Sequence, residues 1–202
     1  VCLRLCLERL SPPLKERPVE FELPPMAGAG AAVAAVAAVA EAVAAGQVER
    51  GLAIVQGTRG RHDGQRRNPW NEFECGSHYA RSMASWSLLT ALSGYSFDLG
   101  EGLLGFAPRV WAEDFRCFWS ADGVWGQYEQ RLGQPARVAL RVDYGQITLN
   151  GLNLGALDNQ IQSIARVSER EWPIRASLVD GTLQVRWSEP VTLTAGETLV
   201  LE

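Results

Sequence analysis

The chemistry-bearing residues of this sequence are concentrated in the stretch Asn68–Arg81, "NPWNEFECGSHYAR". Carboxylates and guanidinium groups make bidentate hydrogen bonds to neighbouring hydroxyls, and an indole face covers the apolar side of a sugar ring. Glu72, Arg81 and Trp70 could supply these three functions, so sugar binding is the chemistry that this stretch suits best. A structural alternative is equally compatible with the composition, because Glu72 and Arg81 could simply pair across a helix N-terminus.

The same stretch carries residue types that are found in two other kinds of site. Cys75 and His78 form a C-x-x-H pair, with His62 and two glutamates nearby. A structural zinc site usually has four well-spaced ligands, and no second close Cys/His pair is present. Cys75 could also act as a nucleophile with His78 as its base, but a spacing of three residues indicates little. The patterns favour a buried thiol and a hydrogen-bonded imidazole, with no metal.

Helices are predicted for the first half of the chain after a proline-rich segment, residues 1–25. From Ala27, valines recur at helical spacing up to Gly46, which is a plausible helix stop. A second helical stretch covers 47–59. A third begins at Ser77, a good N-cap, and ends before Gly94. Residues 97–110 are expected to be loop, and 111–130 a transition segment.

From about Ala136 the hydrophobic period changes from 3.6 to 2, which is typical of strands. Asp180-Gly181 predicts a hairpin, because both central residues of a type I′ turn have positive φ. The alternating segments are "VALRVDY", "QITLNGLNL", "IQSIARVS", "IRASLV", "TLQVRWS", "VTLTA" and "ETLVLE". We therefore predict an antiparallel β module at the C-terminal end.

Composition restricts the class of protein. The chain has 202 residues, 47% of them hydrophobic, and a net charge of −4, which argues against a nucleic-acid-binding surface. Four scattered cysteines and the lack of a recognisable secretory leader indicate a reducing, cytoplasmic location. The apolar run 26–40 is too short for a membrane span. The first residue is Val1 rather than Met, so the chain could begin inside a longer reading frame.

One run of residues resembles a known family. "RNPWNEFECGSHYARSMASW", followed by "LLTALSGYSFD", "LGFAPRV" and "EDFRCFWSADGVWG", resembles the C-terminal end of glycoside hydrolase family 116. This family includes the non-lysosomal glucosylceramidases and bacterial β-glucosidases. The similarity covers roughly residues 46–130, and residues 1–25 and the Ala/Val-rich segment do not match.

The resemblance implies substrate-binding roles for residues of the loop. In the family, the glutamate at Glu72 and the arginine at Arg81 hold glucose hydroxyls, and Trp70 and His78 would shape or support the loop. Both catalytic carboxylates of the family lie upstream of the motif, so no catalytic residue is assigned here, and no cofactor is implied. The substrate would be a β-glucoside or a glucosylceramide-like lipid bound by the full-length enzyme.

The fold class expected from these patterns is α+β. Residues 26–130 would form the last helices of an (α/α)6-barrel, and residues 131–202 the antiparallel β module. Helices without the rest of a barrel would expose apolar faces, so we expect a chain of this length to self-associate and to lack hydrolase activity alone. An alternative is a non-catalytic carbohydrate-binding or structural protein, in which Trp172 and Trp187 would stack on a sugar if both lie on one exposed sheet face. Two tryptophans on strands are more often part of the core.

Overall fold

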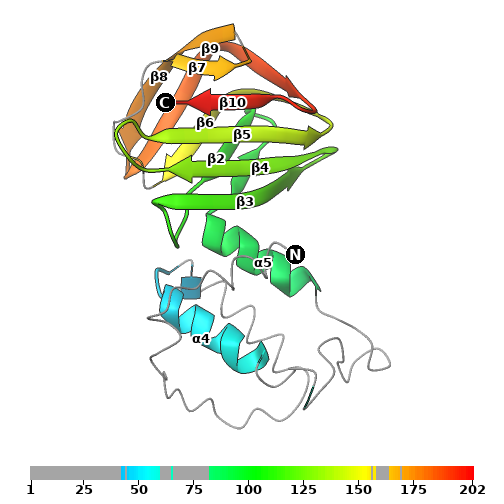
Figure 1. The fold of residues 1–202 in the computed structure, drawn as a ribbon, viewed down its shortest axis with the longest axis vertical. Coiled ribbons are helices and arrows are strands. Elements are labelled where there is room, and N and C mark those ends of the chain that lie inside the picture. The colour runs from blue at the N-terminus through cyan, green and yellow to red at the C-terminus, as the bar shows by residue number, and fades with distance from the viewer. Residues whose placement is uncertain are drawn as a thin grey trace. The chain divides into compact units, whose positions relative to one another are not determined.

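The structure is a computed structural model that describes residues 42–43, 45–59, 65, 82–155, 157, 164–168 and 170–202. The chain divides into two compact units, Val1–Ala91 and Leu92–Glu202, which are considered separately. Two helices with defined bounds lie in the described residues, α4 (Val48–Arg59) and α5 (Ser82–Ser93) (Figure 1).

The ends of these helices follow the predicted glycine signals. Gly46, with φ of +79°, closes the turn before α4, and its N–H donates to Val43 O at 3.0 Å. Gly94, with φ of +59°, directly follows α5. Because a left-handed residue at this position strains any side chain, glycine stops a helix there at little cost. The predicted stops at Gly46 and Gly94 are therefore confirmed, whereas the predicted N-cap Ser77 lies outside the described residues.

The unit Leu92–Glu202 is built on one ten-stranded sheet, whose two halves, called here the first and the second sheet, join at β8 (Figure 1). The first sheet has the order β1-β2-β6-β9-β8, and the second has the order β7-β10-β5-β4-β3. Neighbouring strands are antiparallel except β2 and β6, which are parallel. The strands are β1 (Ser96–Asp98), β2 (Leu103–Phe106), β3 (Asp114–Ala121), β4 (Val124–Arg131), β5 (Arg137–Tyr144), β6 (Gln146–Gly155), β7 (Ile164–Val167), β8 (Arg170–Val179), β9 (Thr182–Thr194) and β10 (Thr198–Leu201).

Strand β8 passes from one sheet to the other. Its first residues pair with β7, as in Val167 with Arg170, and its later residues pair with β9, as in Ile174 with Trp187. The hairpin between β8 and β9 turns at Asp180-Gly181, where φ is 49° and 75°. These positive values confirm the predicted Asp-Gly turn.

The core lies between the two sheets. Phe106 of the first sheet stacks on Tyr128 of the second, with ring centroids 3.8 Å apart and both side chains fully or almost fully buried. Burial raises the pKa of Tyr128 well above its usual value, and its hydroxyl donates to Gln130 Oε1 at 2.7 Å. Gln130 is itself buried and donates to Ala112 O at 3.0 Å, which holds the loop before β3. The buried amide is thus satisfied on both sides, as buried polar groups normally are.

The predicted fold class is wrong. The described residues are mostly strand, arranged as a nearly closed ten-stranded sheet, and they include only two short helices, which conflicts with the predicted (α/α)6-barrel part. Strands begin at Ser96 and include β3 and β4, in the region expected to be loop and transition. The helical spacing of apolar residues predicts barrel helices. Within the described residues, however, helix is present only in α4, α5 and residues 42–43.

In the described part of the chain, no helix is long and apolar enough to cross a membrane.

Candidate functional site

The residues predicted from the sequence to bind substrate, Trp70, Glu72, His78 and Arg81, lie outside the described residues. The same holds for Cys75 and His62. Their roles stay predictions. In the described part of the chain, no group of three or more His, Cys, Asp and Glu side chains is placed to hold a metal ion.

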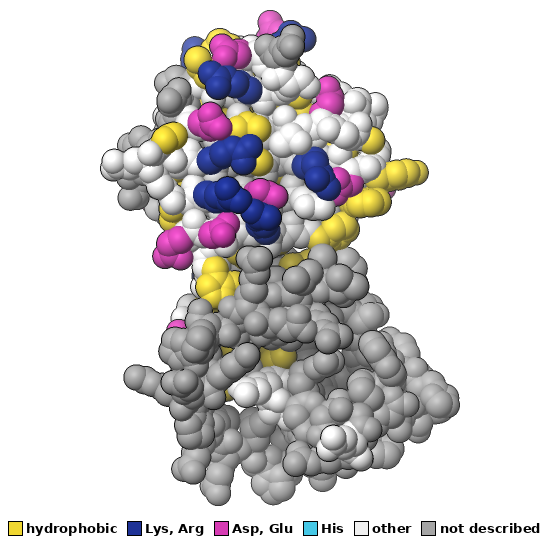
Figure 2. All heavy atoms as spheres, in the orientation of Figure 1, with side chains coloured by type: hydrophobic (Ala, Val, Ile, Leu, Met, Phe, Trp, Pro, Cys, Tyr) yellow, Lys and Arg dark blue, Asp and Glu magenta, His cyan; other side chains and the backbone are white. Residues whose placement is uncertain are grey.

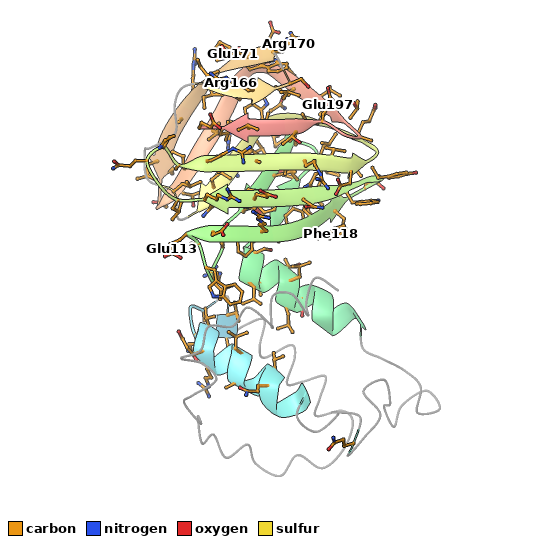
Figure 3. The ribbon with its side chains drawn as sticks, viewed as in Figure 1. Glu113, Phe118, Arg166, Arg170, Glu171 and Glu197 are labelled. Carbon is orange, nitrogen blue, oxygen red and sulfur yellow. The ribbon has the colours of Figure 1, made fainter. Side chains whose placement is uncertain are left out.

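The candidate site in the described residues is a pocket in the β unit with a volume of about 460 Å³. It is formed where the β7–β8 turn and strand β8 meet the later part of β9 and the β9–β10 turn (Figure 3). The side chains come from three stretches of sequence, 167–172, 189–192 and 197. The lining residues are Val167, Ser168, Arg170, Trp172, Glu189, Pro190, Thr192 and Glu197.

Trp172 and Arg170 form a cation–π pair at one wall of the pocket. The Arg170 guanidinium carbon lies 4.6 Å from the centroid of the Trp172 ring. The two residues are separated by one position on β8, so their side chains lie on the same face of the strand. Trp172 is half-buried and Arg170 is exposed, so the pair presents an indole and several N–H donors to solvent.

Glu197 is held in a fixed orientation on the β9–β10 turn. Its Oε2 accepts hydrogen bonds from Thr194 N at 2.7 Å and Thr194 Oγ1 at 2.9 Å. These bonds lower the pKa of Glu197, since they stabilise the carboxylate. The turn is also tied to β5, because Val142 N donates to Glu197 O and Gly196 N donates to Val142 O. A charged acceptor is therefore positioned before any ligand arrives.

This set of groups is suited to a polyhydroxyl ligand. Trp172 offers an apolar ring face, Arg170 offers donors, and Glu189 and Glu197 offer acceptors, which matches the alternation of apolar and polar surface on a sugar ring. Most ligand pockets combine an aromatic wall with a few fixed polar groups in this way.

Trp172 and Trp187 do not share an exposed sheet face, so the condition for both rings to stack on a sugar is not met. Trp187 is only 7% exposed, and its Nε1–H donates to the backbone carbonyl of Leu149 on β6. Trp172 therefore remains the tryptophan of this pair that could contact a ligand. Sequence reasoning missed Arg170, Glu189 and Glu197, because no local pattern shows that the segments around these residues, which are distant in sequence, meet in space.

No protein family model and no curated protein matches the chain. One solved structure that matches is a GH127 β-L-arabinofuranosidase from Geobacillus stearothermophilus T6, a glycoside hydrolase. The similarity has a TM-score of 0.33 and a sequence identity of 17%, and it covers 71% of this chain and 22% of that chain. The matched region therefore spans less than a quarter of that enzyme.

Proposed function

We propose that the chain is the C-terminal part of a glycoside hydrolase that cleaves β-glucosidic bonds, of the β-glucosidase or glucosylceramidase-like kind. The observation that carries this proposal is the run "NPWNEFECGSHYARSMASW", with Glu72 and Arg81 at the positions that hold glucose hydroxyls in glycoside hydrolase family 116. In this proposal the chain positions the sugar and supplies a β unit.

Hydrolysis in such an enzyme would proceed through a covalent glucosyl intermediate. One carboxylate attacks the anomeric carbon as the other protonates the leaving oxygen, and water then releases glucose. Both carboxylates would come from segments upstream of the motif. Glu72 would accept hydrogen bonds from glucose hydroxyls and Arg81 would donate to them, which fixes the ring for attack. Trp70 and His78 would keep the loop in shape.

The proposal predicts the effect of substitutions at Glu72 and Arg81 in the full-length enzyme. Glu72→Gln and Arg81→Lys should each lower kcat/KM for an aryl β-glucoside by about 100-fold, because two hydrogen bonds to a charged group contribute about 3 kcal/mol together. Steady-state kinetics on the protein isolated from its source measures this. Glu49→Gln, on the outer surface of α4, is the control and should change kcat/KM less than twofold.

The size of the native product decides which protein to assay. Immunocapture with an antibody to the β unit, followed by intact-mass measurement, should give a species several times heavier than 22.1 kDa. The 202-residue chain alone should not hydrolyse the aryl glucoside. Turnover by this chain that disappears with Glu72→Gln would overturn the proposed division of roles.

A second candidate function, carbohydrate binding by the β unit, is supported by the Arg170–Trp172 pocket. Cellobiose should bind the 202-residue chain, and Trp172→Ala should weaken binding by about tenfold through loss of the ring contact. Arg81→Ala should leave cellobiose binding unchanged. Titration calorimetry measures both affinities. Binding that is weakened by Arg81→Ala and unchanged by Trp172→Ala would place the sugar at the Glu72–Arg81 loop instead.

A further inference from the structure

Three aromatic side chains lie in a row across adjacent strands of the second sheet. Phe118 of β3, Trp125 of β4 and Tyr144 of β5 make consecutive ring contacts, with centroid separations of 6.0 Å in both pairs. Trp125 is 42% exposed and Tyr144 is 60% exposed. We call these three residues the aromatic row. In Figure 2, hydrophobic side chains project into solvent at one end of the β unit.

The ring geometry leaves surface for a ligand. The Trp125 and Tyr144 rings are nearly parallel, at 13°, but their 6.0 Å separation is much wider than the 3.8 Å of the core pair Phe106 and Tyr128. Neither ring therefore covers the other. Contiguous exposed aromatics are typical of binding surfaces, because contact with a ligand recovers the free energy of burial that is forgone in water.

The backbone fixes the aromatic row. Trp125 is directly opposite Tyr144, and the register of β4 and β5 shifts between Trp125 and Gly126. Gly126 packs against the Arg141 carbonyl, and Gly145, with φ of +77°, packs against the Gly123 carbonyl. The β3–β4 and β5–β6 turns therefore touch each other, and the two exposed rings are held together by rigid strands.

Polar side chains continue the surface along β4 and β5. Gln127 is opposite both Phe118 and Arg141 in the strand register. Arg141 Nε donates to Asp143 Oδ1 at 2.6 Å, and Gln127 Nε2 donates to Asp143 Oδ2 at 3.4 Å. The Arg141 side chain is 48% exposed, so part of its guanidinium faces solvent. The two charges cancel, which leaves donors and acceptors beside the aromatic row without net charge.

We propose that the aromatic row, with Gln127, Arg141 and Asp143, is a binding surface for a neutral chain of β-linked pyranose sugars. Successive sugar rings lie on Trp125 and Tyr144, and their hydroxyls bond to the flanking polar side chains. This surface belongs to the β unit and differs from both the Glu72–Arg81 loop and the Arg170–Trp172 pocket.

The local charge favours this occupant over the alternatives. A protein surface that binds anionic lipids or a nucleic acid usually has unpaired Lys or Arg side chains next to its aromatics, because these cations attract the phosphates. Here three arginines on the outer face each have an acidic partner: Arg141 pairs with Asp143, Arg116 with Glu129, and Arg131 with Asp114. Figure 2 shows dark blue and magenta side chains interspersed over one face of the β unit. A neutral polyhydroxyl ligand matches such a surface.

The test is a titration of the 202-residue chain with cellohexaose by calorimetry, in a Trp172→Ala background that removes the pocket's contribution. Trp125→Ala and Tyr144→Ala should each weaken binding about tenfold, since each removes one ring contact with a sugar. Phe97→Ala is the matched control, because Phe97 is an aromatic 56% exposed on the first sheet, and it should change affinity less than twofold.

Folding and the alternative partner are checked in the same series. Thermal unfolding of each variant confirms that the β unit is intact, and Trp125→Phe keeps a ring and should retain most of the affinity. Absence of cellohexaose binding by the background chain would overturn the proposal, as would equal losses in Phe97→Ala and Trp125→Ala. Binding to phosphatidylcholine vesicles that Trp125→Ala abolishes, without sugar binding, would assign the surface to membranes and would also overturn it. This test measures sugar binding and not hydrolysis. A negative result would therefore overturn the proposed binding surface and leave the glycosidase proposal unaffected.

Discussion

Trp187→Ala should lower the free energy of unfolding by about 3–5 kcal/mol, the usual cost of deleting a buried tryptophan side chain. Trp187 is 7% exposed on β9, opposite Ile174 of β8. Its truncation opens a cavity between the sheets and leaves the Leu149 carbonyl without its indole donor. The loss of packing and the loss of this buried hydrogen bond act in the same direction.

Urea unfolding of the 202-residue chain, followed by far-UV circular dichroism, measures this loss. Trp172→Ala is the matched control, since the same truncation at a half-buried position should cost about 1 kcal/mol or less. Trp187→Phe should fall between the two, because it keeps one ring in the core but removes the donor and part of the indole volume. Equal destabilisation by Trp187→Ala and Trp172→Ala would contradict the burial described here.

Gly126→Ala should be the most damaging single-methyl addition in the β unit, at about 3 kcal/mol or more. A Cβ at Gly126 would collide with the backbone carbonyl of Arg141 on the neighbouring strand, and a backbone atom in a sheet cannot move aside as a flexible side chain can. Overpacking of this kind commonly costs about 1–3 kcal/mol, and relief here requires strands β4 and β5 to separate.

The matched control is Gly133→Ala, in the connection between β4 and β5. A Cβ there would meet the Pro135 carbonyl at 3.6 Å, which is ordinary contact, so stability should change by less than about 0.5 kcal/mol. The midpoints of urea unfolding for the two variants are compared. Since Gly126 also sets the pairing of Trp125 with Tyr144, Gly126→Ala should weaken cellohexaose binding as well. A Gly126→Ala variant as stable as the unsubstituted protein would show that β4 and β5 leave room for a methyl group at this position, contrary to the structure.

The second half of the fold could be predicted because its signals are local. The alternation in 138–154 and 174–201 corresponds to β5, β6, β8, β9 and β10, and Asp180-Gly181 forms the predicted turn. The segments "TLQVRWS" and "VTLTA" form one strand, β9, rather than two, since Pro190 is accommodated within it. Helix α4 and the glycine stops were also predicted from local spacing.

Strands β3 and β4 were missed because aromatic residues occupy both faces of the hairpin. Phe115 and Trp119 point into the core while Phe118 and Trp125 point outward, and buried Gln130 is polar, so the apolar and polar positions do not alternate clearly. One local signal was available. Asp122-Gly123 is the same dipeptide that predicted the β8–β9 turn, and Gly123 has φ of +67°.

The sequence by itself determined the turns, the helix stops and the buried face of the later strands, since these depend on backbone conformation and hydrophobic period over a few residues. The chemistry of the Glu72–Arg81 loop was also predicted from local spacing and resemblance. Only the tertiary structure decided that Trp187 is core and Trp125 is surface, that β2 pairs with β6 in parallel, and that Glu197 meets Arg170 at one pocket. These features depend on which strands pair across long sequence separations, and that choice is made by the packing of the two sheets against each other.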